Sequence, residues 1–178
     1  MNRRSHLPML VTLLLACSLA NFANAQTQST LSPTQHCRDF SADAIVTFAD
    51  LDLAEVVNEA LGLDSGALLH CGQAAGLEEL IVGTTIERVV YGGTLRPSPE
   101  KPFESLNGIQ NLTGLTRLNL INRLITDISP LSSLTNLVNL NLHTNWISDL
   151  GPIRGLINLE QLIVSENPIF DISTLAGL

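Results

Sequence analysis

The sequence predicts an α/β solenoid with a curved parallel β-sheet on its concave face, short 3₁₀ turns on its convex side and a helical cap at its N-terminal end. The first observation behind this prediction is a 22-residue repeat over residues 115–178. The second is the alternation of apolar and polar residues in the first part of each repeat, which is typical of a strand with one buried face. The third is an amphipathic helical pattern that precedes the repeats.

Each repeat places apolar residues in the same columns. A step of 22 residues connects the members of every column: Leu115, Leu137 and Leu159; Leu118, Leu140 and Leu162; Leu120, Leu142 and Val164; Ile125, Ile147 and Ile169; Ile128, Leu150 and Ile172. One repeat offers about seven apolar side chains, worth roughly 1.5–3 kcal/mol each when buried. Ordering its backbone costs about 1–2 kcal/mol per residue. A single repeat is therefore unstable, and the copies must stack.

The first 25 residues have the pattern of a secretory signal peptide. Arg3 and Arg4 are basic, 7–20 is nearly continuously apolar, and 23–25 (Ala-Asn-Ala) fits a cleavage site. The apolar run is too short for a membrane span, so we expect the mature chain to be exported, either periplasmic or secreted. The alternative is an outer-membrane lipoprotein, because the residues before Cys17 resemble a lipobox and Cys17 would then carry a lipid anchor.

The mature chain is acidic. Removing Arg3 and Arg4 leaves 7 basic and 17 acidic residues, which changes the net charge from −8 to −10. An acidic surface argues against nucleic acid and anionic membranes as partners.

Two cysteines remain after the signal peptide, Cys37 and Cys71, and each follows a histidine. An even pair of cysteines in an exported chain predicts a disulfide. The alternative is a metal site that includes His36 and His70. Adjacent residues of an extended chain point in opposite directions, which makes two His-Cys pairs poor tetrahedral chelators. We therefore expect a disulfide and no cofactor.

The mature chain is expected to have three parts. Residues 26–44 are polar and unpatterned, which predicts a flexible segment. Residues 45–75 predict an N-terminal cap with a helix at about 52–61, in which Asp52 is the expected N-cap and Gly62 follows the C-terminal end. Residues 76–178 hold about four repeats.

The first repeat carries an insertion at 85–102. Leu77 and Leu115 occupy the same column but lie 38 residues apart, which is 16 more than one period. Within the insertion, 89–96 fits a hairpin with a two-residue Gly-Gly turn. The prolines after it are expected to prevent regular structure. Insertions of this kind map to surface loops that often lie on the binding face.

Two polar columns have structural interpretations. Asn145 and Asn167 follow a strand, where an amide can bind the backbone of the turn and form a ladder through the stack. Asp127, Asp149 and Asp171 are expected to cap short 3₁₀ turns. Because both columns recur with the repeat, we interpret them as scaffold.

The line LVNLNLHTNWISDLGPIRGL at 137–156 closely resembles the internalin-type leucine-rich repeats of bacteria, and DLDLAEVVNEALGLDSG at 50–66 is similar to their helical cap. The resemblance covers about residues 45–178. It implies a curved solenoid that binds other proteins. The sequence departs from the pattern at Arg123, which takes an Asn position and should loosen that turn. No C-terminal cap follows the last repeat, so the edge at 163–178 is expected to be open, and self-association as a structural envelope component is the alternative function.

Catalytic motifs are missing from the sequence. It contains no G-x-S-x-G, H-E-x-x-H, phosphate-binding loop or dinucleotide fingerprint. We therefore expect a binding protein and not an enzyme.

The candidate partner-binding residues are the outward positions of the strands, together with Tyr91 of the insertion and Trp146 of a turn. The strand positions form three tracks: Glu79, Arg117, Asn139 and Gln161; Ile81, Asn119, Asn141 and Ile163; Gly83, Ile121, His143 and Ser165. A merely solvated face is the alternative for the tracks. For Trp146, the alternative is packing over Leu124, since Trp is common both at binding hot spots and in packing.

Overall fold

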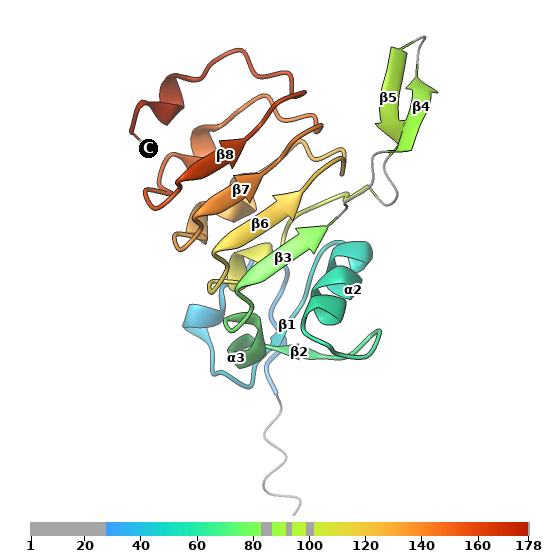
Figure 1. The fold of residues 1–178 in the computed structure, drawn as a ribbon. Helices are drawn as coiled ribbons and strands as arrows, with labels where there is room; N and C mark the ends of the chain where they lie inside the picture. The colour runs from blue at the N-terminus through green and yellow to red at the C-terminus, as the bar shows by residue number, and fades with distance from the viewer. Residues whose placement is uncertain (1–27, 83–86, 92–93, 99–101, 178) are drawn as a thin grey trace, which may run out of the picture.

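The computed structural model describes residues 28–82, 87–91, 94–98 and 102–177. Its main sheet is parallel, with the strand order β3 (Glu79–Val82), β6 (Arg117–Leu120), β7 (Asn139–Asn141) and β8 (Gln161–Ile163). Figure 1 shows these strands stacked side by side, with one turn of each repeat behind them. The predicted solenoid with a parallel sheet is thus confirmed.

The strands pair in the register that the 22-residue period predicts. Leu80 lies opposite Leu118, Leu118 opposite Leu140, and Leu140 opposite Leu162. The returning halves of the repeats form the 3₁₀ turns η2 (Ile109–Asn111), η3 (Ser129–Ser133), η4 (Gly151–Ile153) and η5 (Ser173–Gly177). The aligned apolar columns between strands and turns form one continuous core.

Burial decreases toward β8. Leu118 and Leu140 are buried, whereas Leu162 is only partly buried. Ile172 occupies the column of the buried residues Ile128 and Leu150, yet it is 68% exposed. An apolar column is covered only where another repeat packs against it, so the outermost copy of the column is exposed.

The helical cap is α2 (Leu51–Ala60), which lies beside β3 at the start of the stack. The expectation of Asp52 as its N-cap is wrong. Asp50 is the N-cap: its Oδ1 accepts a hydrogen bond from Leu53 N at 2.8 Å, and its Oδ2 accepts one from Glu104 N at 2.6 Å. Asp50 thus joins the cap to the first repeat, a contact that local sequence cannot reveal. Gly62 follows the helix with φ +67°, as expected for a C-terminal glycine.

The described part of the segment predicted to be flexible, 28–44, is packed against the cap and the convex side of the first repeat. Leu31 is buried in the core, and Gln110 Nε2 donates to Pro33 O at 2.6 Å. The segment includes η1 (Cys37–Asp39). Polar composition misled the prediction because these contacts use backbone carbonyls and a single buried leucine.

The disulfide Cys37–Cys71 is formed, with a Cα–Cα distance of 5.4 Å, which confirms the predicted pairing. It ties η1 to α3 (Cys71–Ala74), next to a small antiparallel pair formed by β1 (Ile45–Val46) and β2 (Leu69–His70). The bond therefore fixes the N-terminal segment to the cap.

The insertion contains β4 (Glu87–Tyr91) and β5 (Thr94–Ser98), an antiparallel hairpin that pairs Tyr91 with Thr94. Figure 1 shows it standing away from the sheet, on the side at which the strands end. The predicted hairpin is confirmed, but the expectation that Pro97 lies outside regular structure is wrong, because Pro97 pairs with Arg88 within β5. Counting from the turn, this pair is a position without ladder hydrogen bonds, where a missing N–H costs nothing.

The predicted signal peptide at 1–25, including Cys17, lies outside the described residues. Within the described part of the chain, no helix is long and apolar enough to cross a membrane.

Candidate functional site: the concave face of the sheet

The outward side chains of the four strands line a shallow hollow of about 180 Å³ on the concave face. Strand pairing aligns Glu79, Arg117, Asn139 and Gln161 in one row and Ile81, Asn119, Asn141 and Ile163 in the next. The predicted alignment of these two tracks is thus confirmed. That these residues bind a partner remains a prediction.

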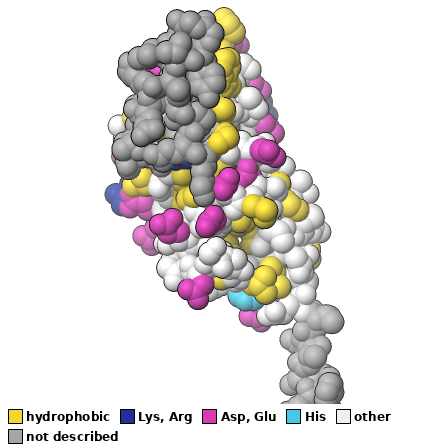
Figure 2. Space-filling model, turned by 90° about the vertical axis from the view of Figure 1, so that its right-hand side faces the viewer, with side chains coloured by type: hydrophobic (Ala, Val, Ile, Leu, Met, Phe, Trp, Pro, Cys, Tyr) yellow, Lys and Arg dark blue, Asp and Glu magenta, His cyan; other side chains and the backbone are white. Residues whose placement is uncertain are grey.

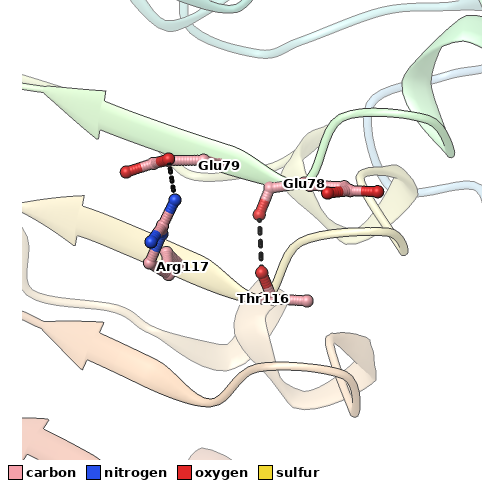
Figure 3. A network of polar contacts seen from close by, with 4 residues as sticks. All are labelled: Glu78, Glu79, Thr116 and Arg117. Carbon is pink, nitrogen blue, oxygen red and sulfur yellow. Dashed lines mark hydrogen bonds and ion pairs between the residues drawn. The ribbon is translucent and has the colours of Figure 1, made fainter.

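The first track is neutralised within itself. Arg117 forms an ion pair with Glu79 across β6 and β3, and Asn139 Nδ2 donates to Gln161 Oε1 at 2.9 Å. Figure 3 shows the ion pair beside the bond from Thr116 Oγ1 to the carbonyl oxygen of Glu78, at 3.1 Å. The ion pair is solvent-exposed, and such pairs stabilise a fold by only about 0–1 kcal/mol. Its groups therefore remain accessible to a partner at little cost.

The second track has amides at its centre and isoleucines at both ends. Asn119 Oδ1 accepts a hydrogen bond from Ile121 N at 3.2 Å, and Asn141 Oδ1 accepts one from His143 N at 3.0 Å. Ile81 is 51% exposed, a large value for an apolar side chain on a sheet. The track thus combines apolar surface with polar groups of fixed orientation.

The third track is described only in part. His143 Nδ1 lies 2.8 Å from Ser165 Oγ, which links the ends of neighbouring repeats. Gly83 lies outside the described residues, and Tyr91 belongs to β4, whose side chains are not described. The structure therefore brings His143 and Ser165 together but does not place Tyr91 against the sheet.

Trp146 and Leu124 lie on the turns that follow β7 and β6, and both are exposed, at 46% and 40%. They extend the concave face to its rim on the side of the inserted hairpin (Figure 1). Trp146 is held through its backbone, because its N–H donates to Ile125 O at 2.8 Å. An exposed Trp on a fixed backbone is a typical binding anchor.

The asparagine ladder that positions these turns is confirmed. Asn145 Oδ1 accepts from the backbone N–H groups of Arg123 and Ile125 at 3.0 and 3.1 Å. Its Nδ2 donates to the carbonyls of Leu120 and Leu142 at 2.8 and 2.9 Å. Asn167 repeats the arrangement, with its Oδ1 accepting from Ile147 N at 3.0 Å. Each ladder amide thus connects two successive turns.

Arg123 takes the ladder position in the second repeat. Its side chain is buried, and its guanidinium carbon lies 5.6 Å from the centre of the Phe103 ring. A ladder Asn here would bind the turn of the preceding repeat, which the insertion replaces. The turn also contains Leu124 at φ +56°, a left-handed conformation that costs a leucine roughly 1–2 kcal/mol.

Sequence reasoning missed a second amide ladder at the other end of the strands. Asn136 Nδ2 donates to Thr113 O, and Asn158 Nδ2 to Thr135 O, both at 2.8 Å. Gly114 holds the equivalent place in the preceding repeat, where a Cβ would overlap the carbonyl oxygen of Ala75. The recurrence of Asn at 136 and 158, with Gly at 114, was the available signal.

The aspartate column caps the 3₁₀ turns from one residue earlier than expected. Oδ1 of Asp127, Asp149 and Asp171 accepts from the backbone N–H two residues ahead, at 2.8, 2.7 and 2.8 Å. The N-cap itself is the next residue, such as Ile128. Hydrogen bonds from the backbone and then the hydroxyl of Ser173 hold the pKa of Asp171 below its ordinary value. The column is therefore scaffold.

Among the described residues, no group of three or more His, Cys, Asp or Glu side chains is arranged to hold a metal ion.

Comparison with known proteins agrees with this geometry. A family model described as Leucine Rich repeats (2 copies) matches residues 113–155. The aligned columns, the parallel sheet and this match define the chain as a leucine-rich-repeat protein. No curated protein sequence matches the chain.

Two solved structures refine the class. An internalin (inlF) from Listeria monocytogenes is 35% identical and covers 73% of this chain, with a TM-score of 0.60. The functional domain of InlJ from Listeria monocytogenes, which includes a cysteine ladder, is 25% identical and covers 72%, with a TM-score of 0.57. This chain spans only 34% and 25% of those chains. The protein is of the internalin type, and its fold indicates a protein-interaction module.

Proposed function

We propose that this chain is an exported, non-enzymatic module that binds a protein partner through the concave face of its sheet and the inserted hairpin. The observation that carries the proposal is the hollow over β3, β6, β7 and β8, which combines exposed Ile81 with polar side chains on a rigid sheet. Interfaces of soluble proteins commonly combine an apolar centre with polar groups at its rim. The hairpin and Trp146 would extend the contact beyond the sheet.

Export is supported by the disulfide, since stable disulfides belong to oxidising compartments. The signal-peptide pattern of residues 1–25 supports it from the sequence. Radiolabelled palmitate and globomycin distinguish the two exported forms. A secreted or periplasmic protein incorporates no label, whereas a lipoprotein anchored at Cys17 is labelled and accumulates as a precursor.

The test of the binding face is a double substitution, Arg117→Ala with Trp146→Ala. Both side chains are exposed, so the melting temperature should stay within a few degrees of that of the unchanged protein. Capture of a partner from cell extract should fall at least about tenfold, as expected when an Arg and a Trp anchor are both removed.

The matched control is Arg154→Ala with Ile157→Ala, which removes an exposed arginine and an exposed isoleucine from the region of η4. This variant should capture the partner as well as the unchanged protein. Equal capture by both double variants would count against the concave face.

Self-association is the second candidate, because Phe170 and Ile172 are 93% and 68% exposed near β8. Exposed apolar side chains beside an unpaired strand edge favour pairing with another copy. Analytical ultracentrifugation decides between the candidates. A concentration-dependent dimer that Phe170→Ser abolishes supports self-association, and a monomer at high concentration excludes it.

A further inference from the structure

The centre of the concave face presents N–H donors to an incoming partner. The backbone N–H groups of Ile121 and His143 can bind only an oxygen, so they fix Oδ1 of Asn119 and Asn141 toward the protein. The Nδ2 atom of each amide must then point the other way. Neither Nδ2 meets an acceptor among the described residues, and both residues line the hollow. The orientation of these two amides follows from chemistry, unlike that of an ordinary surface amide.

The two donors lie side by side on neighbouring strands. Asn119 pairs with Asn141 in the register of β6 and β7, and adjacent strands are about 4.8 Å apart. Two N–H groups at this spacing can converge on the two oxygens of one carboxylate. A carboxylate is acceptor-only, so it satisfies both donors without presenting a donor of its own.

The surroundings of the donors suit such a group. Glu79 is the only carboxylate among the residues that line the hollow, and its ion pair with Arg117 leaves the lining without net charge. Acidic side chains are exposed instead on α2, at Glu55 and Glu59, on the side of the molecule that Figure 2 faces. Ile81 and Ile163 bound the donor pair on both sides and can exclude water from it.

We infer that the hollow receives an aspartate or glutamate side chain of the protein partner, with apolar partner groups over Ile81 and Ile163. This inference rests on the proposed function, because it names the chemistry that the same face recognises.

The test uses Asn141→Asp in the full mature chain. The introduced carboxylate can still accept the His143 N–H, so the fold is retained, but an oxygen replaces the donor that faces the hollow. The matched control is Asn139→Asp, which adds the same charge two residues away on the same strand, where a carboxylate can still accept from the Gln161 amide. Asn119→Asp provides a second donor variant.

The probe is a phage-displayed library of random linear peptides, selected on the unchanged protein. Selected peptides should share an Asp or Glu beside apolar residues. Their affinity, measured by fluorescence anisotropy, should fall about tenfold or more with Asn141→Asp or Asn119→Asp, which is the loss expected for a charge-assisted hydrogen bond. It should change less than about threefold with Asn139→Asp, a difference well below one hydrogen bond. Replacing the peptide's acid by its amide should cause a similar tenfold loss, because a neutral group accepts more weakly.

Ile163→Arg, which blocks the hollow, separates failure of this inference from failure of the proposed function. Peptides that need the open hollow but lack an acid overturn the carboxylate assignment alone. An equal loss with Asn139→Asp and Asn141→Asp also overturns it, because general charge repulsion then explains the effect. A selection that yields only peptides insensitive to Ile163→Arg contradicts both proposals.

Discussion

Asn145 is the side chain on which the turns of the central repeats depend most. We predict that Asn145→Ala destabilises the protein strongly, whereas Asn136→Ala has a small effect, although both remove one ladder asparagine. Asn145 is 3% exposed, and its amide joins the turn of its own repeat to the preceding one. Asn136 is exposed and donates to Thr113 O.

The magnitude follows from the groups that the substitution leaves without partners. Asn145→Ala removes the acceptor of two backbone N–H groups and the donor to two carbonyls, at distances of 2.8–3.1 Å. Each buried polar group without a partner costs about 1–3 kcal/mol, so the lower bound for four groups is about 4 kcal/mol. Water that enters the turn recovers part of this cost. We expect a loss of about 3–4 kcal/mol for Asn145→Ala and about 0.5–1 kcal/mol for Asn136→Ala.

Urea denaturation measures both values. Far-UV circular dichroism reports the whole solenoid, and fluorescence of Trp146, the one tryptophan of the chain, reports the turn beside the substitution. The two transitions of the unchanged protein should coincide, which validates a two-state free energy. Asn145→Asp keeps the accepting oxygen and loses the donor, so its loss should lie between the two alanine variants.

The reasoning is refuted if Asn145→Ala and Asn136→Ala lose the same free energy of unfolding. It is also refuted if Asn145→Asp is as unstable as Asn145→Ala, because the bonds accepted from Arg123 and Ile125 would then contribute nothing.

Three further predictions concern the cap, the disulfide and the last aspartate. Gly114→Ala should destabilise the fold by about 1–3 kcal/mol, the usual cost of overpacking, since its Cβ overlaps Ala75 O, whereas Gly155→Ala, with open space around it, should be neutral in the same urea assay. Replacing Cys37 and Cys71 by serine should cost about 4 kcal/mol of unfolding free energy for a sequence separation of 34, and an unchanged melting curve would exclude this role. A carbon-detected NMR titration should find the pKa of Asp171 lowered, and Ser173→Ala should raise it part of the way, because the backbone bond remains. Since the folded-state pKa is the lower one, the stabilisation by Asp171 exists above the ordinary carboxyl pKa and disappears as pH falls through its own value; a titration at the ordinary value would contradict this.

Much of the fold could be predicted because each repeat carries its own register. Leu118 and Leu140 must face the core, and a shift by one residue would turn them to solvent, so periodicity alone aligns the strands. The same register predicted the tracks on the concave face. The hairpin was predictable too, because Gly92 and Gly93 mark a turn between two short strand patterns.

Contacts between distant backbone groups could not be predicted in this way. Asp50 and Asp52 are equally good N-caps by residue type, and only the approach of Glu104 N to Asp50 distinguishes them. The polar segment at 28–44 is fixed by Gln110, which binds a carbonyl 77 residues away in sequence. Residue type carries no record of which backbone group is nearby.

The sequence by itself therefore determined the period, the strand register, the apolar columns and the disulfide, because these depend on residue type at a regular spacing. Only the tertiary structure decided how the cap and the N-terminal segment seal the first repeat, and why Gly114 replaces an asparagine there. It alone decided the orientation of Asn119 and Asn141 as well, because the direction of an amide depends on which backbone N–H group its oxygen meets. The donors that the concave face presents are a consequence of that choice.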